Sequence, residues 1–147
     1  MEPVPVILLA EDDPNDIFFF RRAFQKAQVK CQIMDVPNGQ EAVRYLQGTH
    51  SYRDRTDFPF PRLLLLDLKM PLMNGFDVLE WLRSQPKLTD LPVLVLSSSA
   101  HEADISRARE LGARSYHVKP NDHTQLTELA QELASRWLTG NVLASRP

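Results

Sequence analysis

Short apolar runs alternate with longer amphipathic stretches along almost the whole chain. Runs that have the length of β-strands cover residues 6–10, 31–36, 63–66, 93–96 and 115–118. The run at 63–66 is four consecutive leucines, and a strand that is apolar on both faces is typical of a parallel sheet covered by helices on two sides. The pattern therefore predicts an α/β fold with five β/α repeats in one doubly wound sheet.

The stretches between these runs carry helix signals. Asp13 and Pro14 form an N-cap followed by a first-turn proline, so a helix is expected to start there, with Ile17, Phe20 and Phe24 facing the sheet. Asp13 is therefore interpreted as a cap and not as part of a binding site. Further helices are predicted over 40–47, 76–84, 101–111 and 122–138.

Two segments fall outside this alternation. Residues 48–61 are polar and aromatic by turns and form a long loop, for which a functional or mobile role and a tolerated surface insertion are both open. Residues 139–147 are expected to be a flexible tail. The prediction is thus one domain over 1–138, with no attached output domain.

Composition narrows the classes of function. The chain has 147 residues, 43% hydrophobic and 24% charged, which fits one ordinary globular domain. Its net charge of -2 is spread without a basic strip, so nucleic acid binding is not expected. The single cysteine, Cys31, has no partner for an internal disulfide, and no apolar run reaches membrane-spanning length. These observations favour a cytoplasmic protein that does not bind membranes.

Chemically active residues follow the predicted strands directly. Because ligands bind at the carboxyl ends of parallel strands, these side chains are expected to converge. Carboxylates this close repel one another by roughly 4 kcal/mol per pair unless a cation intervenes, and Mg²⁺ prefers such oxygen ligands. The residues are Glu11 and Asp12 after the first run, Asp67 after the third, Ser97 after the fourth and Lys119 after the fifth.

Each of these residues also has an ordinary structural explanation. An aspartate after a buried strand, such as Asp67, is often a turn former or helix cap, and Lys119 taken alone could be a solvated surface lysine. Ser97 begins a run of three serines that could be a plain loop, although only Ser97 directly follows the strand. The four histidines show no metal-ligand spacing and are assigned no role.

Taken together, these motifs resemble the receiver domains of response regulators over nearly the whole chain. The resemblance rests on ED at 11–12, DLKMPLMNG at 67–75, a serine at 97 and YHVKP at 116–120. It implies a flavodoxin-like (β/α)5 sheet with strand order 2-1-3-4-5. It also implies that the chain works in a two-component phosphorelay and is not an enzyme beyond its own phosphoryl transfer and dephosphorylation.

The resemblance assigns specific roles at the acidic end of the sheet. Asp67 is implied as the phosphoacceptor, and Mg²⁺ is implied to bind Glu11, Asp12, Asp67 and the backbone carbonyl of Lys69. Glu11 stands where the family commonly has aspartate, and its extra methylene suits contact through water. The Lys69 side chain, together with Ser99, is a candidate for tuning how fast water removes the phosphoryl group.

The resemblance also implies a conformational switch. Ser97 and Tyr116 match the hydroxyl and aromatic positions that move together on phosphorylation in the family, while Lys119 contacts the phosphoryl group. The peptide between Lys119 and Pro120 is expected to be cis, as in the family. This shift would alter the face formed by 101–111, 115–118 and 122–138, where partners bind.

The chain is further similar to single-domain regulators that partner bacterial phytochrome histidine kinases. This similarity rests on the Glu-Asp pair, the 48–61 loop, the lack of an output domain and the ending Trp137-Leu138. It implies a sensor histidine kinase, of phytochrome type, as partner. It also suggests a homodimer through the face defined above.

Two other classes of function remain as alternatives. A receiver-like adaptor that acts without phosphorylation would share the fold, but Asp12, Asp67 and Lys119 are all retained here. A phosphohydrolase with an aspartate nucleophile would carry a second aspartate two residues later for acid-base work, where this chain has Lys69. The sequence therefore favours a phosphorylation-dependent response regulator.

Overall fold

The structure, a computed structural model, describes residues 4–138 and contains one five-stranded parallel sheet. The strand order is β2-β1-β3-β4-β5, which confirms the predicted 2-1-3-4-5 topology. The predicted tail at 139–147 lies outside the described residues. The strands are β1 (Val6–Ala10), β2 (Gln32–Val36), β3 (Leu63–Leu66), β4 (Val93–Ser97) and β5 (Ser115–Val118).

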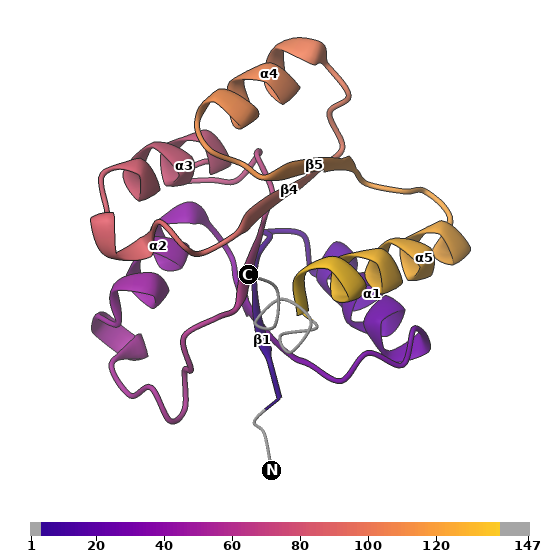
Figure 1. The fold of residues 1–147 in the computed structure, drawn as a ribbon, viewed down its shortest axis with the longest axis horizontal. Helices are drawn as coiled ribbons and strands as arrows, with labels where there is room; N and C mark the ends of the chain where they lie inside the picture. Colours follow the sequence, from indigo (N-terminus) through magenta and orange to yellow (C-terminus); the bar gives the residue numbers. More distant parts are fainter. Residues whose placement is uncertain (1–3, 139–147) are drawn as a thin grey trace, which may run out of the picture.

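Helices cover both faces of this sheet. Helices α1 and α5 lie side by side on one face, and α2, α3 and α4 lie on the other (Figure 1). The helices are α1 (Pro14–Lys26), α2 (Gly39–Gln47), α3 (Gly75–Arg83), α4 (Glu102–Glu110) and α5 (His123–Leu133), which continues into a π-helical turn at Ala134–Leu138. Short 3-10 turns occupy His50–Tyr52 and Pro86–Leu88.

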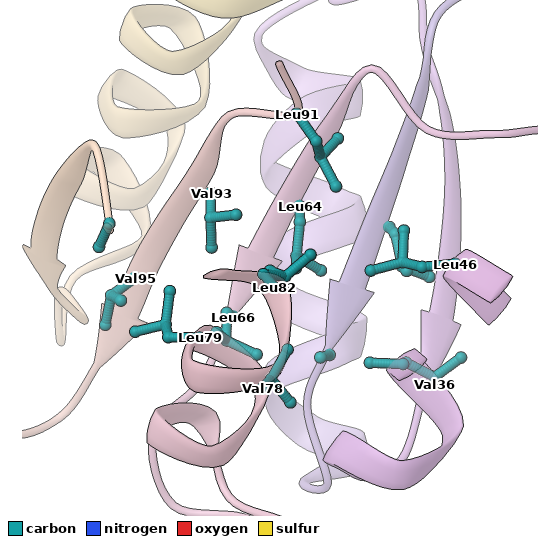
Figure 2. Packing of buried hydrophobic residues seen from close by; sticks show 14 of the residues in the cluster. Val36, Leu46, Leu64, Leu66, Val78, Leu79, Leu82, Leu91, Val93 and Val95 are labelled. Carbon is teal, nitrogen blue, oxygen red and sulfur yellow. The ribbon is translucent and has the colours of Figure 1, made fainter. Parts of the chain in front are cut away.

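The alternation of side chains along each strand divides the core into two layers. Leu64 and Leu66 of β3 point toward α2 and α3, where they pack with Val78 and Leu79 (Figure 2). Leu63 and Leu65 point the other way, toward α1 and α5. All four β3 leucines are at most 2% exposed, and burying each contributes roughly 1.5–3 kcal/mol. This two-sided burial explains why the run shows no polar alternation.

The predicted elements agree with the structure to within a residue or two at most ends. Asp13 caps α1 as expected, since its side chain accepts a hydrogen bond from the Asn15 N–H. Phe20 and Phe24 are buried on the sheet, and Ile17 packs at the edge of the same cluster. The clearest difference is the last helix, predicted over 122–138, where regular α-helix ends at Leu133.

The 48–61 segment is anchored to α2 by its aromatic residues. The rings of Tyr52 and Phe58 pack against Tyr45, with centroids 5.1 and 6.0 Å away. The Tyr52 hydroxyl donates a 2.6 Å hydrogen bond to Glu41 Oε1, and the Arg55 guanidinium donates to the carbonyls of Leu46 and Phe58. The segment therefore extends the hydrophobic cluster beneath α2, which its alternating polar and aromatic sequence did not indicate.

Replacing Tyr52 with phenylalanine tests this anchor. The hydrogen bond from Tyr52 holds the pKa of Glu41 below its usual range, so the bond is made to an ionised carboxylate. Its loss is expected to lower the free energy of unfolding by about 1–2 kcal/mol in urea denaturation at pH 7. The deficit should shrink as acid protonates Glu41, because a carboxyl group with a lowered pKa stabilises the fold only while ionised. An Arg53→Gln variant in the same segment, where the side chain is exposed, should match the wild type within about 0.5 kcal/mol.

None of the helices within residues 4–138 combines the length and the apolar character that a membrane span requires.

Candidate functional site: an acidic pocket at the carboxyl edge of the sheet

Three carboxylates meet where β1 and β3 end side by side. The parallel register pairs Ala10 with Leu66, so the next residues, Glu11 and Asp67, leave the two strands at the same level. The Asp67 N–H donates to the Ala10 carbonyl at 3.1 Å and fixes this position. Asp12 follows Glu11, and one carboxylate oxygen from each of the three residues lies within 4.8 Å of the others. The predicted convergence of these side chains is therefore present.

Burial differs sharply among the three carboxylates. Glu11 is 1% exposed and Asp67 is 6% exposed, whereas Asp12 is open to solvent. Buried carboxylates are costly unless a cation or a proton offsets their charge. The site thus has two carboxylates that need compensation and a third that faces the solvent.

Lys119 supplies part of that compensation. Its Nζ lies 2.7 Å from Glu11 Oε1, 2.8 Å from Asp16 Oδ2 and 3.4 Å from Asp67 Oδ2. Asp16 stands in the first turn of α1 and was not predicted as a site residue. Its sequence position indicates only a favourable acidic residue near a helix N-terminus, and the partner lies 103 residues away. Only the packing of α1 against the loop before α5 reveals this contact.

The pKa values show how strongly these groups interact. Burial raises the pKa of Glu11 to about 7; the hydrogen bond from Lys119 lowers it by less, and the neighbouring Asp67 charge raises it further. Burial by itself would lower the pKa of Lys119, but hydrogen bonds to Asp16 and Glu11 outweigh burial and raise it above its usual value. Lys119 is therefore a fixed positive charge at physiological pH.

The loop after Asp67 is shaped by the Asn-Gly pair that begins α3. Asn74 and Asp77 form a reciprocal capping box, with bonds of 2.9 and 3.1 Å to each other's backbone N–H. At Gly75, a Cβ atom would lie 2.4 Å from the Asp67 carbonyl oxygen, so any other residue would displace the Asp67 backbone. Asn74 and Gly75 thus have a local structural role, because together they start α3 directly against the Asp67 backbone.

Lys69 lies in this loop, two residues after Asp67. Its backbone N–H is 3.4 Å from Asp67 Oδ1 and its side chain is exposed. Among the described residues, the Lys69 side chain takes no part in the ion pairs of the site. The predicted use of the Lys69 carbonyl as a metal ligand stays a prediction.

Ser97 and Tyr116 are connected through Ser99. Ser97 is fully buried at the end of β4, and its Oγ accepts a 3.1 Å hydrogen bond from the Ser99 N–H. The Tyr116 hydroxyl donates to the Ser99 carbonyl at 2.8 Å, and the Ser99 hydroxyl donates to Asp104 of α4 at 2.6 Å. Ser99 therefore links the strand end, β5 and α4, whereas the sequence suggested only a role for it in dephosphorylation.

The peptide between Lys119 and Pro120 is trans, so the expected cis bond is wrong for this structure. The expectation came from the family resemblance, because the two isomers of an X-Pro bond differ by only about 0.5–1 kcal/mol and the local sequence does not choose between them. The Lys119 ammonium reaches all three of its carboxylate partners with this bond trans. Aiming Lys119 into the site therefore does not require the cis form.

Two hollows flank the acidic residues. One, of about 280 Å³, lies between α1 and the start of α5, with Asp16 and Lys119 in its wall. The other, of about 580 Å³, lies over the loop after β3 and is lined by Asp12, Lys69 and Asp104 among others. The acidic residues are therefore reached from the solvent side at Asp12, which is exposed.

The donor set fits a hard divalent cation. The three carboxylates offer only oxygen, which suits Mg²⁺ or Mn²⁺. Once Glu11 is ionised, Glu11 and Asp67 carry more negative charge than Lys119 alone offsets. A carboxylate beside such a cation and a fixed ammonium can accept a phosphoryl group, because both positive charges stabilise the transferring oxygens.

This chain belongs to the response regulator family, since residues 7–131 match the model of the response regulator receiver domain. The match covers all of the sheet except Val6, together with the acidic residues and most of α5. The receiver class predicted from the sequence is thus confirmed.

Several response regulators are similar to this chain over most of its length. The chain is 31% identical over 136 residues to the response regulator Rcp1 of Synechocystis sp., and the match covers 92% of this chain and 90% of Rcp1. It is 32% identical over 136 residues to FilR2, a probable methanogenesis regulatory protein of Methanothrix harundinacea, and this match covers 92% of this chain and 85% of FilR2. The structure of phosphorylated RcpA, a cyanobacterial phytochrome response regulator, superposes with a TM-score of 0.85 at 32% identity (94% and 96% covered). A Mn²⁺-bound form of Rcp1 superposes with a TM-score of 0.81 at 30% identity (92% and 95% covered).

Proposed function

We propose that this chain is a phosphorylation-dependent response regulator in which Asp67 takes a phosphoryl group from a histidine kinase. The observation that carries the proposal is the Asp67 carboxylate, buried at a strand end within 4.8 Å of two other carboxylates and 3.4 Å from Lys119 Nζ. The phosphorylated state of RcpA and the Mn²⁺-bound form of Rcp1 support this reading.

In the proposed reaction, an oxygen of Asp67 forms a bond to phosphorus while the bond from phosphorus to the kinase histidine nitrogen breaks. Asp12 and Asp67 would hold Mg²⁺ directly, with Glu11 through water and the Lys69 carbonyl completing the protein ligands, and the bound cation would neutralise charge on the phosphoryl oxygens. Lys119, with its Nζ 3.4 Å from Asp67 Oδ2, would contribute a second positive charge. The chain itself is not proposed to turn over an external substrate; it promotes only its own phosphorylation and dephosphorylation.

The proposed response runs through Ser97 and Tyr116. A phosphoryl oxygen on Asp67 offers a new acceptor for the Ser97 hydroxyl at the end of the adjacent strand. A shift of Ser97 would move the Ser99 N–H that is hydrogen-bonded to it. Ser99 is also hydrogen-bonded to Tyr116 and Asp104. Phosphorylation would thereby shift the population of α4 and β5 positions, which is the change a partner reads.

We further propose a kinase of the phytochrome type, action in the cytoplasm and homodimer formation through α4, β5 and α5. The kinase proposal rests on the likeness to Rcp1 and RcpA, against which stands the similarly strong match to a methanogenesis regulator. The dimer proposal rests on family resemblance, together with Val118 of β5, which is 45% exposed. The alternative of an adaptor that acts without phosphorylation predicts no adduct under any condition below.

The function is tested by incubating the protein with acetyl phosphate, with and without Mg²⁺, and measuring intact mass. A single phosphoryl adduct is expected with Mg²⁺ and almost none with excess chelator, because an anionic donor then meets uncompensated carboxylates. Asp12→Asn should reduce the adduct at limiting Mg²⁺ and recover at higher Mg²⁺. Absence of any adduct in the wild type, or an adduct independent of the metal, would contradict the proposal.

A further inference from the structure

Three carboxylate groups share the ammonium of Lys119. It carries three N–H groups and has three carboxylate partners, of which Glu11 at 2.7 Å and Asp16 at 2.8 Å are near and Asp67 at 3.4 Å is far. Charge-assisted bonds from ammonium to oxygen are usually 2.7–2.9 Å long. Lys119 is therefore in close contact with Glu11 and Asp16 and is farther from the proposed phosphoacceptor, Asp67.

A phosphoryl group on Asp67 would change this balance. It adds negative charge and terminal oxygens at Asp67, and full contact with them requires Lys119 to move toward Asp67 and away from its two nearer partners. The Glu11 side chain is 2% exposed, and its release would remove the only ammonium paired with it in the described part of the chain. The Asp16 side chain is 37% exposed. Water can replace Lys119 at Asp16 but not at Glu11, so the Asp16 contact is the one that opens.

We propose that Asp16 is a positioning residue that holds Lys119 back from the phosphoryl group and so limits the occupancy of the phosphorylated state. It acts through the Lys119 ammonium and touches no reacting atom. Its place on α1 also ties α1 to the loop before α5 while the site is unphosphorylated. The inference rests on the proposed function, because it concerns the same phosphoryl site.

The test uses the full chain with Mg²⁺ and beryllofluoride, a stable mimic of the phosphoryl group, followed by calorimetry. Asp16→Asn keeps the side-chain shape and is expected to bind beryllofluoride about threefold to tenfold more tightly than the wild type, the scale of a partly exposed ion pair. Its affinity for Mg²⁺ alone should fall slightly, because one negative charge is lost and Lys119 settles closer to Asp67. A damaged site would instead weaken the binding of both Mg²⁺ and beryllofluoride. Tighter beryllofluoride binding together with weaker Mg²⁺ binding therefore distinguishes a positioning role of Asp16 from a purely structural one.

Two comparisons isolate the path through Lys119. Asp13→Asn removes the same charge from the same end of α1 while keeping a residue that caps the helix, and it should leave beryllofluoride affinity within about twofold. In a Lys119→Gln background, which binds beryllofluoride more weakly, Asp16→Asn should have no further effect, as a double-mutant cycle requires for residues that act together.

The outcomes distinguish the two proposals. Unchanged or weaker beryllofluoride binding in Asp16→Asn, an equal gain in Asp13→Asn, or an undiminished gain in the Lys119→Gln background would each overturn the role of Asp16 while leaving the phosphorylation of Asp67 standing. If the wild type binds no beryllofluoride and takes no phosphoryl group from acetyl phosphate, the proposed function fails and this inference fails with it.

Discussion

Replacing Asp67 with asparagine is expected to abolish the phosphoryl adduct completely. The amide has the shape of the carboxylate but lacks the anionic oxygen that attacks phosphorus. Within residues 4–138 no other carboxylate takes its position, since Glu11 is buried against Lys119 and Asp12 faces the solvent. Intact mass after incubation with acetyl phosphate and Mg²⁺ measures the result.

The fold should survive this substitution, so the loss can be assigned to chemistry. Lys119 keeps its nearer partners Glu11 and Asp16, and the crowded site loses one negative charge. We expect the free energy of unfolding without Mg²⁺ to change by less than about 1 kcal/mol. Asp57→Asn, at an exposed aspartate in the 48–61 segment, is the matched control and should take up phosphoryl groups as the wild type does. An equal adduct on the Asp67 variant would reject Asp67 as the acceptor.

The second large effect is expected from Lys119→Gln, which should lower the free energy of unfolding by about 2–4 kcal/mol in the absence of Mg²⁺. Removing one member of a buried ion pair commonly costs 3–5 kcal/mol, and the 18% exposure of the Lys119 side chain reduces this somewhat. Glu11 and Asp67 would both remain buried without their ammonium. Chemical denaturation at several pH values measures the loss.

This loss should depend on pH with a definite sign. The pKa of Glu11 is raised to about 7, so below that pH Glu11 is largely protonated and needs no counter-ion. The deficit of Lys119→Gln is therefore expected to be smaller near pH 6 and to grow toward pH 8. Added Mg²⁺ should recover part of the stability, because a cation held by the same carboxylates replaces the missing charge.

Lys69→Gln provides the control for lost positive charge. Lys69 lies in the loop next to Asp67, but its side chain is exposed. We expect a change within about 0.5 kcal/mol and no dependence on pH or Mg²⁺. A Lys119 variant as stable as this control would show that the three ion pairs contribute nothing to the fold.

Much of the fold was determined by the sequence because its signals are local and repeated. An apolar run such as 63–66 is buried on both faces only in a covered parallel sheet, and the residue that follows it must lie at the carboxyl edge. That rule alone places Glu11, Asp12, Asp67 and Lys119 near one another. Asp13 as a helix cap also follows from its neighbours in the chain.

Tertiary structure decided the features whose local signals are weak. Asp16 is an ordinary first-turn aspartate until packing brings it to Lys119, and Ser99 is one serine of three until it meets Tyr116 and Asp104. The role of the aromatic residues in 48–61 becomes clear only from their packing against Tyr45. The isomer before Pro120 depends on a difference of about 0.5–1 kcal/mol, which surrounding contacts easily outweigh. Strand ends follow from periodicity along the chain. The partner of a charged or polar side chain depends instead on which distant segments the fold brings close to it.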